Sequence, residues 1–202
     1  DSTCLLLTLA ALHRSLGFTV ARRSRALRGF KHPAMHRALV WDVRRLGEVA
    51  PRIEYVETER RSLFEKYLAR FDRGVGERLD VMPTQVIHGD VHAANVIVDP
   101  FDVERVIGIV DFGDMTHGAR VLDAAITAGY QTFGTDPVDA LVAVVAAYHM
   151  IDPLEPYELD LIPDLVAARL TQSYLISRWR AALHPENAAY INADAEDVYR
   201  AL

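Results

Sequence analysis

Apolar positions recur at helical spacing in the first and last parts of the chain. Residues 3–16 predict an amphipathic helix that ends at Gly17, and residues 18–33 are basic and irregular. A short helix with Trp41 as its core anchor is predicted for residues 36–47. Helical spacing predicts further helices over residues 56–73, 120–133, 137–149 and 157–183, with a terminal turn from residue 194.

The middle of the chain has a different pattern. Three short runs of β-branched residues, each bounded by turn residues, predict strands over residues 85–88, 95–98 and 105–110. Runs of this length suit a small sheet. The predicted fold class is therefore α+β and mainly helical, with one compact β insert that carries all the candidate chemistry.

Two polar segments begin where these β runs end, His88-Gly89-Asp90 and Asp111-Phe112-Gly113-Asp114. A hairpin between them would bring Asn95 and Asp111 side by side, and their oxygen atoms are ligands that suit Mg²⁺. The spacing of Asp90, Asn95 and Asp111 is the one that kinases use for phosphoryl transfer. In that chemistry the first Asp accepts the proton of the attacking hydroxyl, while the Asn and the second Asp hold metal against the nucleotide phosphates.

The sequence segment VIHGDVHAANVIVD, followed by VIGIVDFGDM, resembles the aminoglycoside phosphotransferase and choline kinase superfamily. The continuation GIVDFGDMTHGARVLDAAITAGY is most similar to the hydroxylysine kinase group. The flanking segments also resemble this group in order and spacing, at Trp41-Asp42, at Arg169-Leu170 and at Pro185-Glu186-Asn187 before a Tyr. Gly89, where protein kinases have Arg, favours a small-molecule phosphotransferase over a protein kinase.

The resemblance implies a protein-kinase-like fold and a role for each motif residue. Asp90 would be the catalytic base, and Asn95 and Asp111 would bind the metal and the nucleotide cofactor. His88 and Asp123 would brace the catalytic loop from behind. The implied cofactors are Mg²⁺ and ATP or GTP, and the implied partner is a small cationic amino-alcohol substrate such as hydroxylysine, an aminoglycoside or choline.

Several neighbouring residues have more than one interpretation. His92 would touch substrate or phosphate, or stabilise the loop through a hydrogen bond. Asp114 would add a carboxylate near the metal or recognise a substrate amine. His117 and Arg120 would border the substrate site or be exposed loop residues. A zinc site built from His88, His92 and Asp111 is a less favoured alternative, because this spacing is not a regular zinc pattern.

The parts of a kinase that cover the nucleotide have no counterpart in the sequence. The glycine pair Gly74 and Gly76 ends a helix, and neither Lys31 nor Lys66 lies in a strand. We therefore expect residues 1–202 to be the C-terminal, catalytic lobe without its N-terminal lobe, and weakly active alone. Two alternatives are a truncated, non-catalytic ligand-binding module and the kinase domain of a larger protein fused to an aminotransferase.

Composition and charge narrow the classes of partner that the chain is expected to bind. The net charge of −6 argues against general nucleic-acid binding, and the Arg22-Arg23-Ser24-Arg25 cluster is interpreted as a solvated basic face rather than a phosphate site. No apolar run approaches the length of about 18 residues that crosses a membrane. The single Cys4, taken as a small buried side chain, excludes an internal disulfide and fits a reducing cytoplasm. The oligomeric state is not readable from these patterns.

Overall fold

The computed structural model describes residues 2–133 and 136–202, with side chains described from residue 9 onward. Its contacts divide the chain into two compact units. The first contains the segments up to Arg37 and Met82–Ile162, and the second contains Ala38–Val81 and Pro163–Leu202. Cys4 lies outside the described side chains.

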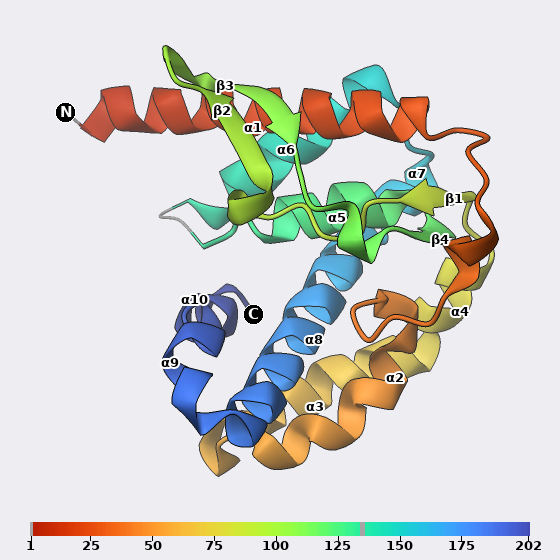
Figure 1. Ribbon diagram of the computed structural model, residues 1–202, viewed down its shortest axis with the longest axis vertical. Coiled ribbons are helices and arrows are strands. Elements are labelled where there is room, and N and C mark those ends of the chain that lie inside the picture. The colour runs from red at the N-terminus through yellow and green to blue at the C-terminus, as the bar shows by residue number, and fades with distance from the viewer. Residues whose placement is uncertain (1, 134–135) are drawn as a thin grey trace. The chain divides into compact units, whose positions relative to one another are not determined.

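The first unit contains helices and two small sheets, and strand β3 (Asp102–Ile109) crosses helix α1 in Figure 1. Helix α1 packs along α6 and against strand β3, and α5 packs on α6. The interior includes Val20 and Val144, neither of which is measurably exposed. The helices of this unit are α1 (Ser2–Ala26), α5 (Val121–Gly129), α6 (Pro137–Ile151) and α7 (Pro156–Leu159), with a 3₁₀ turn at Pro33–His36.

The prediction that the first helix ends at Gly17 was wrong, because α1 continues to Ala26. A Cβ atom at Gly17 would lie 2.3 Å from the Val144 carbonyl oxygen and 2.8 Å from the Ala147 Cβ. Glycine at this position allows the backbones of α1 and α6 to approach closely. It is an interior packing residue rather than a helix stop.

Gly17→Ala is expected to lower the free energy of unfolding by about 1–3 kcal/mol, since the added methyl group overpacks a backbone contact. The higher helix propensity of Ala, worth about 1 kcal/mol, is the smaller effect. Gly47→Ala is the matched control, because a Cβ there meets nothing within 4 Å. Urea unfolding of both variants checks the prediction, and equal midpoints would contradict the close approach of the two helices.

The three predicted strands are present, but the sheet is divided. Strands β2 (Val96–Asp99) and β3 (Asp102–Ile109) form an antiparallel hairpin, while β1 (Thr84–Ile87) pairs antiparallel with β4 (Thr116–Ala119). Strand β4 was not predicted, because its sequence THGA has little of the β-branched character that marks a strand. Pairing with β1 determines its conformation.

The second unit is entirely helical in the part that the structure describes. Phe64 of α3 stacks on Tyr174 of α8 with ring centroids 4.4 Å apart, and both side chains are buried. The predicted 36–47 helix is instead broken into short turns, and Trp41 is only half-buried. The helices are α2 (Leu46–Val49), α3 (Arg61–Arg70), a π-helical segment (Phe71–Val75), α4 (Gly76–Asp80), α8 (Ile162–Leu183), α9 (Ala188–Ile191) and α10 (Ala195–Ala201), with 3₁₀ turns at Val43–Arg45, Ala50–Tyr55, Thr58–Arg60 and Pro185–Asn187.

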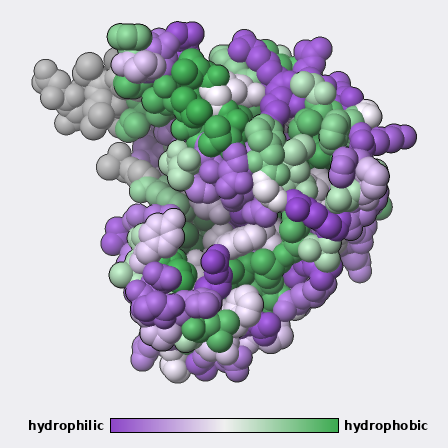
Figure 2. Space-filling view, viewed as in Figure 1, coloured by the Kyte–Doolittle hydropathy of each residue, from purple (hydrophilic) through white to green (hydrophobic). Residues whose placement is uncertain are grey.

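Two surface properties follow from this arrangement. Charged and apolar side chains are interspersed on the face that Figure 2 views. Among the described residues, none of the helices combines the length and apolar character that a bilayer crossing requires.

Candidate active site

Residues 88–95 form the loop that was predicted to be catalytic, and we call it the catalytic loop. It begins directly after β1 and is anchored by a buried carboxylate of α5. The backbone N–H groups of His88 and Gly89 donate to Asp123 Oδ1 over 3.1 and 3.0 Å. Asp123 is 1 % exposed. A carboxylate that accepts two backbone donors in this setting holds the start of the loop rigidly.

A turn at Gly89 then redirects the chain. Its φ of 76° is in the left-handed region that favours glycine. A Cβ there would lie 3.4 Å from the carbonyl oxygen of Asp114, so the turn also packs closely against the second motif. The left-handed conformation and the close contact together explain why this loop carries glycine at position 89.

Asp90 and Asn95 meet across the loop. Asn95 Nδ2 donates to the Asp90 backbone oxygen at 2.9 Å and approaches Asp90 Oδ2 at 3.3 Å. His92 Nε2 lies 3.5 Å from the same carboxylate oxygen. The Asp90 side chain is 19 % exposed, so it is held by neighbours and still reachable from solvent.

The β2–β3 hairpin brings the second motif to the catalytic loop, as the spacing predicted. Val110 N–H donates to the Asn95 carbonyl oxygen over 2.9 Å, and Asp111 is the next residue. Asp111 is exposed and has a φ of 63°, which is uncommon for a residue other than glycine. Its Oδ1 accepts from Gly113 N–H at 3.0 Å. We call residues 111–115 the Asp111 turn.

His88 connects the two segments from behind. Its Nε2 lies 3.2 Å from the Val110 carbonyl oxygen, and its ring centroid is 5.1 Å from that of Phe112. Burial lowers the pKa of His88, and the nearby Arg23 charge lowers it further. A neutral imidazole can donate from Nε2 to the carbonyl, which ties the strand before Asp111 to the catalytic loop.

The donor set fits a hard divalent cation. Because Asn95 Nδ2 is used on Asp90, the amide oxygen Oδ1 is left for a cation, and Asp111 supplies an exposed carboxylate. Mg²⁺ commonly takes one or two protein oxygens and completes its shell with water and phosphate. Among the described residues, no three His, Cys, Asp or Glu side chains are grouped to hold a metal ion. The geometry thus gives the zinc alternative no support.

Comparison with known proteins now places the chain in a family. The sequence profile of the "Phosphotransferase enzyme family" matches residues 5–161. The chain belongs to the phosphotransferase enzyme family. The resemblance drawn from the two motifs is thereby confirmed.

Curated relatives of the chain include proteins named hydroxylysine kinase. The chain is 27 % identical to hydroxylysine kinase of Mus musculus over 199 residues, which cover 93 % of the chain and 53 % of that protein. It is 30 % identical to hydroxylysine kinase of Xenopus laevis over 154 residues, covering 72 % of the chain and 41 % of that protein. The chain therefore spans about half the length of the curated relatives that it matches.

A solved structure supports the fold. It is described as "Amicoumacin kinase hAmiN in complex with AMP-PNP, Ca2+ and Ami", and it matches the phosphotransferase chain with a TM-score of 0.61. The identity is 16 %, and the match covers 93 % of this chain and 59 % of that one. The helix-rich architecture with small sheets is therefore a kinase-like fold.

The remaining predicted residues have distinct environments in the structure. His92 lies between Asp90 and the ring of Tyr130, whose centroid is 5.6 Å from that of His92. His92 Nδ1 also accepts from Ala94 N–H at 3.4 Å, which is the loop-stabilising contact considered for it. Asp114 is half-buried within the Asp111 turn, and the His117 ring centroid lies 4.8 Å from that of His36.

Arg120 is not an exposed loop residue. Its guanidinium pairs with Glu158 and Asp152, whose side chains are both fully buried. Arg120 also donates to the Pro153 carbonyl oxygen over 2.9 Å. Buried carboxylates require compensating charge, so the role of Arg120 is structural.

The prediction that Arg23 belongs to a solvated basic face was wrong. Arg22 and Arg25 are exposed, but Arg23 Nη2 lies 2.9 Å from Asp123 Oδ2 and its side chain is 12 % exposed. Ser24 is fully buried. The basic cluster is therefore not uniformly solvated. A signal was available, since Val20, Ala21 and Ser24 continue the small and apolar face of the first helix beyond Gly17.

Proposed function

We propose that this phosphotransferase transfers the γ-phosphate of ATP or GTP to a hydroxyl group of a small amino compound, with Mg²⁺ as the cation. The observation that carries the proposal is the meeting of Asp90, Asn95 and the Asp111 turn at one end of the β2–β3 hairpin. A carboxylate that can take a proton and two oxygen donors for a cation are what phosphoryl transfer to an alcohol requires.

Each residue has a definite part in this proposal. Asp90 orients the substrate hydroxyl and takes its proton as oxygen attacks the γ-phosphorus and the nucleoside diphosphate leaves. Asn95 keeps the Asp90 carboxylate in place through Nδ2, and its Oδ1 and the Asp111 carboxylate would hold Mg²⁺. The cation, when bound, offsets negative charge on the phosphate oxygens. His88 and Asp123 keep the loop in register without touching the reacting atoms.

The acceptor is proposed to be cationic. Asp90, Asp111 and Asp114 make the site acidic, which favours an ammonium-bearing substrate electrostatically. The curated relatives are named for hydroxylysine, and the structural neighbour was solved with AMP-PNP and Ca²⁺. Hydroxylysine combines an amine and a hydroxyl in one small molecule, so it is the first acceptor to test.

We further propose that the chain is the catalytic lobe of a longer phosphotransferase. Its relatives are about twice as long as the segment that matches. A preceding lobe would supply the phosphate-covering loop and the strand lysine that kinases need. The proposal predicts weak nucleotide binding by these 202 residues alone.

The test is nucleoside-diphosphate release by a protein extended upstream by the proposed lobe, beside the 202-residue chain. Both are assayed with Mg²⁺, ATP or GTP and a panel of 5-hydroxylysine, kanamycin, choline and homoserine. Release that depends on one acceptor, and that is much faster in the longer protein, would support the kinase and the missing lobe together. Binding of nucleotide without release for any acceptor would instead favour a non-catalytic binding module.

A further inference from the structure

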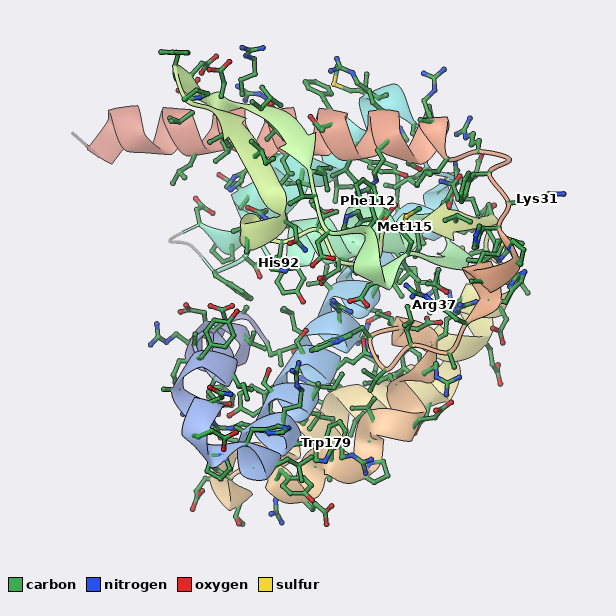
Figure 3. The ribbon with its side chains drawn as sticks, in the orientation of Figure 1. Lys31, Arg37, His92, Phe112, Met115 and Trp179 are labelled. Carbon is green, nitrogen blue, oxygen red and sulfur yellow. The ribbon has the colours of Figure 1, made fainter. Side chains whose placement is uncertain are left out.

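The first three residues of the Asp111 turn are exposed, yet one arginine from a distant segment holds the turn. Arg37 Nη2 donates to the carbonyl oxygen of Gly113 and, over 3.2 Å, to that of Met115. The two carbonyls flank Asp114, so a single guanidinium nitrogen fixes the curvature of the turn. In Figure 3 Arg37 lies below Met115 and Phe112, whereas Lys31 of the same connecting segment points away from the fold.

The segment that presents Arg37 is itself anchored to β4. Thr116 Oγ1 donates to the Met35 carbonyl oxygen over 3.2 Å, and the rings of His36 and His117 are 4.8 Å apart. An exposed hydrogen bond alone contributes little, because ordering a long side chain costs entropy. These anchors place the Arg37 backbone next to the turn in advance, so less freedom is lost when its guanidinium binds.

Gly113 transmits the contact to the carboxylate. Its N–H donates to Asp111 Oδ1 over 3.0 Å, and its carbonyl oxygen accepts from Arg37. Asp111 also holds a left-handed backbone conformation, which costs free energy in a residue with a side chain. A turn of this kind keeps one arrangement only when its surroundings stabilise it.

We propose that Arg37 is a positioning residue that fixes the Asp111 carboxylate for cation binding. The inference rests on the proposed function, in which Asp111 holds the divalent cation. Arg37 acts through Gly113 and does not touch the cation or the substrate.

A positioning role and a purely electrostatic role of Arg37 predict opposite changes in metal affinity when Arg37 is removed. A positive charge near Asp111 repels a cation, so if charge were the main contribution of Arg37, its removal would tighten metal binding. The Arg37 guanidinium is exposed, and interactions between exposed charges are typically weak. Loss of the turn geometry is therefore the larger effect, and removal of Arg37 weakens metal binding.

The test is Mn²⁺ binding by the protein extended upstream by the proposed lobe. Binding is monitored in the presence of AMP-PNP by the electron paramagnetic resonance signal of free Mn²⁺. Arg37→Ala is expected to raise the Mn²⁺ dissociation constant about tenfold, which is about 1.4 kcal/mol. Arg37→Lys, which keeps a donor at this position, should recover part of the loss. Lys31→Ala, the matched control, should bind Mn²⁺ as the wild type does.

Two further readouts separate positioning from a general loss of structure. Half-saturating Mg²⁺ should rise about tenfold in Arg37→Ala, while kcat at saturating Mg²⁺ stays within about twofold of wild type. Amide exchange should accelerate in residues 111–116 and remain unchanged in α5. Unchanged or tighter Mn²⁺ binding by folded Arg37→Ala would overturn the inference alone. A wild-type protein that neither binds Mn²⁺ nor transfers phosphate would overturn the proposed function and the inference with it.

Discussion

Asp90→Asn is expected to reduce kcat by about 10²–10⁴-fold and to leave the fold unchanged. Asparagine has nearly the shape of aspartate but cannot accept the proton of an attacking hydroxyl. The Asn95 Nδ2 bond to the Asp90 backbone oxygen does not depend on the side chain, so the catalytic loop should keep its conformation. Steady-state kinetics of nucleoside-diphosphate release with saturating acceptor measure the effect.

Two measurements make the Asp90 result interpretable. Asp80→Asn alters an exposed aspartate at the end of α4 and should retain wild-type activity. Urea unfolding of Asp90→Asn should give the wild-type midpoint, because the side chain is partly exposed and its replacement introduces no cavity. Full activity in folded Asp90→Asn would exclude this residue as the base.

Arg23→Met is expected to produce the largest loss of stability, about 3 kcal/mol or more. It removes the cation beside Asp123, a carboxylate that is 1 % exposed. Among the described residues, the backbone N–H donors of His88 and Gly89 then remain to stabilise that charge. Methionine retains most of the apolar volume, so the loss reports charge rather than packing. Chemical denaturation of Arg23→Met and wild type gives the difference directly.

Two comparisons separate charge from helix propensity in α1. Arg22→Ala changes the exposed neighbour and should stay within about 0.5 kcal/mol of wild type. Adding Asp123→Asn to Arg23→Met should recover part of the loss, since no uncompensated buried charge is left. The loss of stability caused by Arg23→Met should persist in high salt, because salt screens a buried ion pair only weakly. If the denaturation midpoint of Arg23→Met equalled that of Arg22→Ala, Asp123 would need no charged partner from α1.

The contact between Arg23 and Asp123 is electrostatic more than directional. Their closest atoms are 2.9 Å apart, but among the described residues no acceptor lies along the N–H directions of the buried guanidinium nitrogens. His88 Nδ1 is likewise buried without an acceptor or donor in the described part of the chain. These atoms lie behind the catalytic loop, where polar groups are costly to bury and small changes have large effects.

Local sequence was sufficient wherever a short segment determines its own structure. The three strands next to the motifs and the hairpin that brings Asn95 toward Asp111 were predicted from the sequence. In each case the signal is contained within a few residues, as β-branched runs, turn residues and motif spacing. The family followed for the same reason, because the chemistry of phosphoryl transfer is concentrated in two short motifs.

Tertiary structure decided the role of residues whose partners come from distant segments. A glycine that follows an apolar helical run is typical of a helix end, yet Gly17 lies within α1 and allows it to approach α6. Arg23, Arg37 and Arg120 all resemble solvated surface charges in the sequence, but the groups that they contact belong to α5, the Asp111 turn and the α6–α7 region. The sequence by itself predicted the family and the loops that carry the candidate chemistry. Only the fold decided which side chains hold those loops in place, because ion pairs and close helix contacts depend on long-range packing that local patterns do not contain.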